Sequence, residues 1–496
     1  MVSPVVHLAL RASQAAAPLS MATSSRVLGV VSNTLRLGGL VVVGAVLLGV
    51  TMAWLLERTA VPGRRALSVV SVLPLVVPTY VAAIALRDAF GPRPLLVELP
   101  GMVGLPGATL VLVLSTYPYV LLLVRASLSR SDPALEEAAR ALGDGVPRSF
   151  VRVVLPGLRP AIVAGGLLVF LYVLSDFGAV GILQYNTLTV AIFTEYRTSF
   201  AREPAAVLGV VLVVLTAGAI AVERGLRGRP AAGRVVAARR PTALVDLGRW
   251  RWPAAVAGWC VVALGAGVPV GVLVYRAATS HGQGDPAGVL MAALTTSIGV
   301  SAAAAVVTVV VAVPVAVLAV RHRSAFSTAV ETLSISGYAL PGLVIALALV
   351  FFASRYVPAV YQTLTLVVLA YLVRFFPEAL GSVRSSLLRI DPALEDAARS
   401  LGRRPVGVAA TVTVPLLRSG LTAGAALVFL TAMKELPATL LLRPAGYDTL
   451  ATRVWTGASE GFAAQAAPAG LVLVAVSALA LIPLRRMSVD TPPVTQ

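Results

Sequence analysis

The stretch Asp132-Pro-Ala-Leu-Glu-Glu-Ala-Ala-Arg-Ala-Leu-Gly143 returns 259 residues later as Asp391-Pro-Ala-Leu-Glu-Asp-Ala-Ala-Arg-Ser-Leu-Gly402, with ten of twelve positions identical. Prolines around it repeat at the same or a similar offset: Pro118 with Pro377, Pro156 with Pro415, and Pro78 with Pro341. Agreement over so long a pattern indicates a tandem duplication, which is common among transporters.

Each copy of this stretch is predicted to form a short amphipathic helix. Asp132 is a suitable N-cap, and Gly143 is able to end the helix in a left-handed conformation. One narrow apolar face follows from helical spacing, made by Leu135, Ala138, Ala139 and Leu142. A second short helix is predicted from Pro147 to Val154, ending before Pro156.

The composition places the chain in a membrane. Of its 496 residues 58% are hydrophobic and 12% charged, and its mean hydropathy is +0.89. Many apolar runs approach the roughly 20 residues that cross a bilayer as a helix. We expect an all-α bundle of two parallel repeats with 11 helices, near residues 35–56, 67–89, 103–129, 161–184, 205–223, 253–276, 294–320, 328–354, 361–387, 419–440 and 465–484.

The basic residues indicate topology rather than nucleic-acid binding. The net charge is +18, but the arginines concentrate in short loops between apolar runs, which places those loops in the cytoplasm. Lys434 is the one lysine, so no Gly-Lys pair exists and a Walker A phosphate loop is excluded. Any ATP hydrolysis must therefore come from another subunit. Cys260, the one cysteine, lies in an apolar run and is predicted to be a buried structural thiol.

Three regions follow from the repeat. Residues 1–223 form the first repeat, with its loop at about 132–160, and residues 253–496 form the second, with its loop at about 391–419. Residues 224–252 are arginine-rich and broken by Gly and Pro, as in a cytoplasmic linker. Parallel repeats need an even helix count each, and Pro4–Ala12 aligns with Pro269–Ala277. We therefore expect a start further upstream that would restore a twelfth helix.

The repeated loop resembles the EAA loop of permease subunits of ATP-binding-cassette importers. The first copy has Glu137-Ala138-Ala139, Gly143 and Leu155-Pro156; the second has Asp396-Ala397-Ala398, Gly402 and Val414-Pro415. The resemblance implies that these residues dock an ATPase dimer on the cytoplasmic side. It also implies an extracytoplasmic substrate-binding protein, a location in the bacterial plasma membrane, and ATP-Mg bound by the partner with no cofactor in this chain.

The fused layout is similar to that of iron(III)-type importer permeases. The stretches that carry the likeness are Met433–Pro444, Tyr447–Ala451 and, in the first repeat, Ser175–Ala179. The resemblance implies ferric iron or a ferric complex as substrate, while permeases for thiamine, phosphonates, polyamines, sulfate or molybdate share the architecture. A secondary transporter also fits a repeated bundle, although it has no need of two docking loops.

Charged residues in apolar stretches are candidates for the substrate pathway. Asp176 and Glu435 occupy equivalent positions, and Lys434 is adjacent. The alternative is structural: Glu435 would pair with Arg443 or Lys434, and Asp176 with another polar group. The charged residues before the last helix either contact a binding protein or are solvated; they are Arg443, Asp448, Arg453 and Glu460. His7, His281 and His322 are scattered, so neither a metal site nor an enzymatic centre is expected.

Overall fold

The computed structural model describes residues 2–15, 17–131, 133–198, 203–226, 244–279, 286–322, 324, 327, 330 and 340–489. Within these ranges the chain is almost entirely helical, with one isolated parallel bridge between Thr59 and Val245. A helix satisfies its backbone N–H and C=O groups within one segment, as hydrocarbon surroundings require. The predicted fold class is therefore confirmed.

The chain divides into two compact units. The first-repeat unit comprises Leu19–Thr198 and Val211–Arg276, and the second-repeat unit comprises Met1–Pro18, Ser199–Val210 and Ala277–Gln496. Helix α12 (Glu203–Leu226) thus begins in the second-repeat unit and ends in the first-repeat unit. Each unit is built around three mutually packed core helices.

In the first-repeat unit the core helices are α3 (Ser25–Arg58), α6 (Leu105–Leu128) and α9 (Leu155–Ser175). Small residues allow their close approach: a Cβ added to Gly49 of α3 would lie 2.7 Å from the Cβ of Val120. Between α3 and α6 the chain forms α4 (Arg64–Val70), η1 (Leu73–Leu75) and α5 (Thr79–Phe90), with a bend of 102° before α5. Pro78 precedes α5 in an extended conformation.

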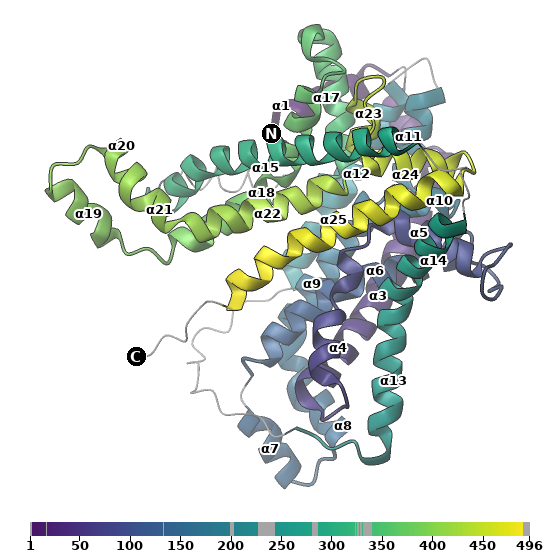
Figure 1. Ribbon diagram of the computed structural model, residues 1–496, viewed down its shortest axis with the longest axis vertical. Helices are drawn as coiled ribbons and strands as arrows, with labels where there is room; N and C mark the ends of the chain where they lie inside the picture. Colours follow the sequence, from purple (N-terminus) through teal and green to yellow (C-terminus); the bar gives the residue numbers. More distant parts are fainter. Residues whose placement is uncertain are drawn as a thin grey trace. The chain divides into compact units, whose positions relative to one another are not determined.

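The second-repeat unit has the same plan. Its core helices α15 (Ala287–Arg321), α18 (Leu364–Leu387) and α22 (Arg418–Met433) lie side by side (Figure 1). Helix α17 (Gly342–Tyr356) corresponds to α5 and follows Pro341, whose ψ of 138° is close to the 142° of Pro78. The proline equivalence seen in the sequence therefore marks the same backbone turn in both repeats.

Shorter elements complete each unit. In the first-repeat unit they are α2 (Pro18–Ala22), α7 (Pro133–Ala141), α8 (Val146–Ser149), η2 (Phe150–Val154), α10 (Gly178–Ile182), α11 (Leu188–Thr198) and η3 (Gly248–Trp250). In the second-repeat unit they are η6 (Pro358–Val360), α19 (Pro392–Ser400), α20 (Pro405–Val408), η7 (Ala409–Thr413), α21 (Val414–Leu416), α23 (Pro437–Leu442), α24 (Leu450–Ser459) and α25 (Ala463–Val489).

The compact units differ from the sequence repeats in their first helices. Helix α1 (Val2–Ser13), from the first repeat, packs on α17 in the second-repeat unit. The opening segment of the second repeat, comprising α13 (Arg251–Val262), η4 (Ala263–Gly267) and α14 (Val268–Thr279), lies almost wholly in the first-repeat unit. There Arg276 pairs with Asp88 of α5 at 3.0 Å. Each unit thus carries the first helix of the other repeat.

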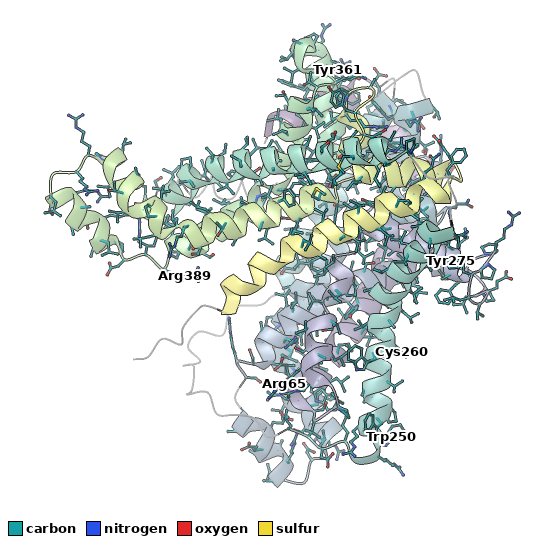
Figure 2. The ribbon with its side chains drawn as sticks, viewed as in Figure 1. Arg65, Trp250, Cys260, Tyr275, Tyr361 and Arg389 are labelled. Carbon is teal, nitrogen blue, oxygen red and sulfur yellow. The ribbon has the colours of Figure 1, made fainter. Side chains whose placement is uncertain are left out.

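The described ranges contain seven helices long and apolar enough to cross a membrane, or up to nine when each of two bent pairs is one span. Two shorter apolar helices, Gly342–Tyr356 and Gln465–Ala480, lie where further spans were predicted. The number of spanning helices, counted with the bent pairs and the two shorter helices, is close to the eleven expected. Cys260 lies on α13 between Trp250 and Tyr275 (Figure 2) and is exposed, so the prediction of a buried thiol is wrong: no part of the chain that the structure describes covers it.

Candidate functional site

The two repeated loops lie at the ends of the core helices. Figure 1 shows α19 and α20 beyond the ends of α18 and α22, and α7 and α8 hold the equivalent place in the first-repeat unit. Gly143 and Gly402 have φ of +94° and +82°, so the predicted left-handed helix ends are confirmed. The amide of Asp144 donates to the carbonyl of Ala139 at 3.1 Å, which closes the α7 terminus.

One face of each loop helix is exposed. Leu142 and its equivalent Leu401 are 89% and 83% exposed. The side chains of Glu137, Ala138, Asp396 and Ala397 are exposed as well. Ala139 is half-buried and Ala398 buried. Of the predicted apolar face, Ala138 and Leu142 are therefore exposed and Ala139 is partly covered, while the side chain of Leu135 lies outside the described residues. Exposed leucines beside an acidic residue form a compact surface that a protein partner is able to cover.

The opposite face of each loop helix holds a buried glutamate. Glu136 lies 3.8 Å from the Nε of Arg58, the last residue of α3, and Glu395 lies 3.3 Å from the Nε of Arg321, the last residue of α15. Neither glutamate is among the site residues predicted from the sequence. The available signal was that Arg58 and Arg321 repeat at the 263-residue offset of the Pro78 pair.

The segment after each loop helix is wound as a π-helix, η2 in the first repeat and η7 in the second. In the first repeat η2 continues directly into α9, so the prediction that the helix ends before Pro156 is wrong. Pro156 stands in the first turn of α9, where a missing N–H costs no α-helical bond, and the wider π-turn precedes it. In the second repeat the helix bends by 69° near Leu417 instead.

Asp176 is buried at the break between α9 and α10. Its Oδ2 accepts a hydrogen bond of 2.6 Å from the hydroxyl of Thr79, the first residue of α5. Its Oδ1 accepts from the amides of Ala179 and Val180 at 3.0 and 3.3 Å. The carboxylate therefore caps α10 and fastens this break to α5. These partners match the structural alternative considered for Asp176.

Glu435 is buried at the equivalent break between α22 and α23. Its Oε1 accepts from the amide of Ala438 at 3.2 Å, and its Oε2 pairs with the Nε of Arg374 on α18 at 3.1 Å. The structural alternative named Arg443 or Lys434 as the ionic partner of Glu435, and the structure shows Arg374 in that role. Arg443 is instead paired with Asp448 in the following loop, because the break directs Glu435 towards α18.

The surroundings of the two carboxylates differ between repeats. Gly342 of α17 corresponds to Thr79, and a Cβ there would clash with the Arg374 guanidinium, so the missing side chain makes room for the cation. The second-repeat unit also holds Glu378, which accepts a hydrogen bond from Thr431 at 3.1 Å and interacts electrostatically with Lys434. The positions equivalent to Arg374, Glu378 and Lys434 are Ser115, Tyr119 and Ser175.

The charged residues before the last helix are partly accounted for. Asp448 pairs with Arg443 and lies 3.5 Å from Arg453. Glu460 stands at the C-cap of α24. These ion pairs connect residues of the loop between α23 and α24. Contact of these residues with a binding protein stays a prediction.

Comparison with known proteins gives matches over both repeats. The model of the family described as "Binding-protein-dependent transport system inner membrane component" matches residues 45–228 and again 308–487. The Fe(3+)-transport system permease protein FbpB 2 of Haemophilus influenzae is 34% identical over 492 residues, covering 97% of this chain and 95% of that protein. The molybdenum transport system permease protein ModB of Escherichia coli is 31% identical over 216 residues, 40% of this chain and 94% of that protein.

A third relative matches a shorter part of the chain. The sulfate transport system permease protein CysT of Escherichia coli is 35% identical over 144 residues, which covers 28% of this chain and 52% of that protein. The double family match and the end-to-end similarity to one fused relative agree with the internal duplication.

Proposed function

The chain belongs to the binding-protein-dependent transport system inner membrane component family, and from that premise we propose that it forms the translocation pathway of an ATP-driven ferric iron importer. It is a multi-pass inner membrane permease, a transporter rather than an enzyme. The proposal rests on its similarity over 97% of its length to an Fe(3+)-transport permease. The cargo is ferric iron or a ferric complex.

The partners of the proposed importer are an ATPase dimer in the cytoplasm and a substrate-binding protein outside. Two features support the ATPase as partner. The chain has no phosphate loop of its own, and each repeat presents an exposed docking surface consisting of Glu137, Ala138, Leu142 and Gly143 in the first repeat and Asp396, Ala397, Leu401 and Gly402 in the second. Small residues beside one large leucine suit insertion into a cleft. Two such surfaces suit the two subunits of a dimer.

The carboxylates Asp176 and Glu435, with Lys434, are proposed to stand beside the substrate route. Ionisable side chains at membrane depth are costly and commonly mark such routes. The hydrogen bonds of both carboxylates also stabilise the fold. Loss of the Glu435 carboxylate should destabilise the fold more than loss of the Asp176 carboxylate, because Glu435 pairs with the positive charge of Arg374. The two roles are separable by substitutions that keep the hydrogen bonds of Asp176.

The proposed function is tested by reconstitution. The permease is copurified with the ATPase subunit it binds, placed in proteoliposomes with its binding protein, and supplied with radiolabelled ferric citrate. We expect ATP-dependent uptake of iron that excess molybdate and sulfate do not reduce. Uptake of labelled molybdate or sulfate in place of iron would contradict the substrate assignment. ATP-independent uptake driven by a proton or sodium gradient would contradict the importer class.

A further inference from the structure

We call α7 and α19, the helices that carry the docking surfaces, the docking helices. Each has a glutamate on its buried face, Glu136 in α7 and Glu395 in α19, and this glutamate lies against the last residue of a core helix. The side chains of Arg58 and Glu136 are 4% and 5% exposed, and those of Arg321 and Glu395 are 14% and 7% exposed. Both ion pairs join the same two elements of the repeat, the first core helix and the docking helix. The same ion pair therefore recurs at the equivalent place in both repeats.

Stability alone is a weak reason for such a pair. Removing two charges from water costs several kcal/mol, so a buried ion pair is often no more stabilising than apolar residues of similar volume. An ion pair supplies instead an electrostatic connection between two elements, and at Arg321–Glu395 it includes a hydrogen bond of 3.4 Å from Nη2 of Arg321 to Oε1 of Glu395. The outer face of the docking helix is exposed, so its attachment to the rest of the unit lies on the face that carries the glutamate.

We propose that Arg58–Glu136 and Arg321–Glu395 are coupling ties, which transmit movement of each docking helix to the first core helix of its own repeat. The inference rests on the proposed docking of the ATPase. Arg58, Glu136, Arg321 and Glu395 are positioning residues in this scheme and need not touch the ATPase. A displacement of α7 reaches α3 through the first tie, and a displacement of α19 reaches α15 through the second.

The arginines of the ties also hold the start of the docking loop. Arg58 donates to the hydroxyl of Ser131 at 2.5 Å and to the carbonyl of Leu128 at 3.4 Å, and Arg321 donates to the carbonyl of Ile390 at 3.1 Å. Ile390 is the equivalent of Ser131. Each arginine therefore clamps both the loop entrance and the docking helix to one helix end.

Further contacts stiffen each junction. The carbonyl of Arg58 accepts a hydrogen bond of 2.8 Å from Val245, near the end of the linker. Glu395 accepts a hydrogen bond of 3.1 Å from Thr413 in η7. Arg140 and Arg399 also pair with the two glutamates, but they lie on or at the end of the docking helices and so do not connect them to the membrane.

From the tie, motion passes into the transmembrane core. Helix α3 packs along α6 and α9, and α15 packs along α18 and α22. Closely packed helices resist deformation, so a shift at one helix end is expected to be carried along the helix. The ties give each docking helix a route to the core that is separate from its covalent connections.

The test compares Arg58→Gln with Glu57→Gln. Glu57 precedes Arg58 on α3 and pairs with Arg125 of α6 at 2.8 Å, so it is an ion pair at the same helix end that does not involve the docking helix. Both variants, and Arg58→Gln with Arg321→Gln, are measured in the full complex in proteoliposomes. The readouts are assembled complex, basal ATP hydrolysis, hydrolysis stimulated by loaded binding protein, and iron uptake.

We expect the double variant Arg58→Gln/Arg321→Gln to assemble and to hydrolyse ATP basally, while stimulation and uptake fall about ten-fold, a typical coupling loss. Glu57→Gln should remain near wild type. The charge exchange Arg58→Glu/Glu136→Arg should recover part of the uptake lost in Arg58→Gln. If Arg58→Gln reduces the amount of complex, Arg58→Lys, which keeps the charge but has fewer donors, is measured instead.

Wild-type stimulation and uptake in the double variant would overturn the coupling ties, as would an equal loss in Glu57→Gln. These outcomes are distinct from failure of the proposed function. In that case the wild-type complex itself would show no stimulated hydrolysis and no ATP-dependent uptake, before any variant is compared.

Discussion

Neutralising the two equivalent carboxylates should have unequal effects on stability. In Asp176→Asn the amide oxygen is able to accept from Ala179, and the amide NH2 is able to donate to the hydroxyl of Thr79. The cap survives, so we expect a loss of about 1 kcal/mol, in the range of a weakened helix cap. In Glu435→Gln the Arg374 guanidinium loses its carboxylate, which lies 3.1 Å away.

Breaking a buried ion pair by removing one partner costs about 3–5 kcal/mol. Arg374 is partly exposed, so we place Glu435→Gln near the lower end, about 3 kcal/mol. The double variant Arg374→Gln/Glu435→Gln removes both charges and should recover most of that loss. The assay is thermal unfolding of the purified permease in detergent, with each variant compared at the same protein and detergent concentration.

Equal destabilisation by Asp176→Asn and Glu435→Gln would refute the reasoning, because the two sites differ in having a cation partner in one repeat only. So would a double variant no more stable than Glu435→Gln alone. The same variants address the substrate route. Asp176→Asn keeps the fold, so slower iron uptake in it would support a place beside the pathway, and unchanged uptake would exclude that role for Asp176.

Three further predictions follow from particular glycines and from the single cysteine. Gly143→Arg and Gly402→Arg should each abolish stimulated ATP hydrolysis in the reconstituted complex without loss of membrane insertion, whereas Gly143→Asn, which accepts left-handed backbone, should retain it. Gly49→Val should destabilise the permease by about 1–3 kcal/mol in thermal unfolding because the added atoms meet Val120, while Gly39→Val on the same helix, where nothing lies within 4 Å, should have little effect. Cys260→Ala should leave melting temperature and uptake unchanged, and a marked loss would mean that Cys260 packs against protein.

Much of the architecture was readable in the sequence because bilayers constrain it strongly. Apolar runs of spanning length predict helices, and the repeat of Asp132 to Gly143 predicts two matching halves. The left-handed glycines were also predictable, since a helix end requires little beyond its own residues. Pro156 was misread because its effect depends on the π-turn before it, which composition does not reveal.

The sequence by itself thus determined the membrane class, the duplication and the location of the docking loops, because each depends on local composition or on repetition along the chain. Only the tertiary structure decided which side chains meet. Asp176 and Glu435 hold equivalent positions, yet one accepts from Thr79 and the other pairs with Arg374, residues 97 and 61 positions away in the chain. The pairing of Glu136 with Arg58 likewise appears only on folding, because electrostatic interactions depend on distance in space rather than on separation along the chain.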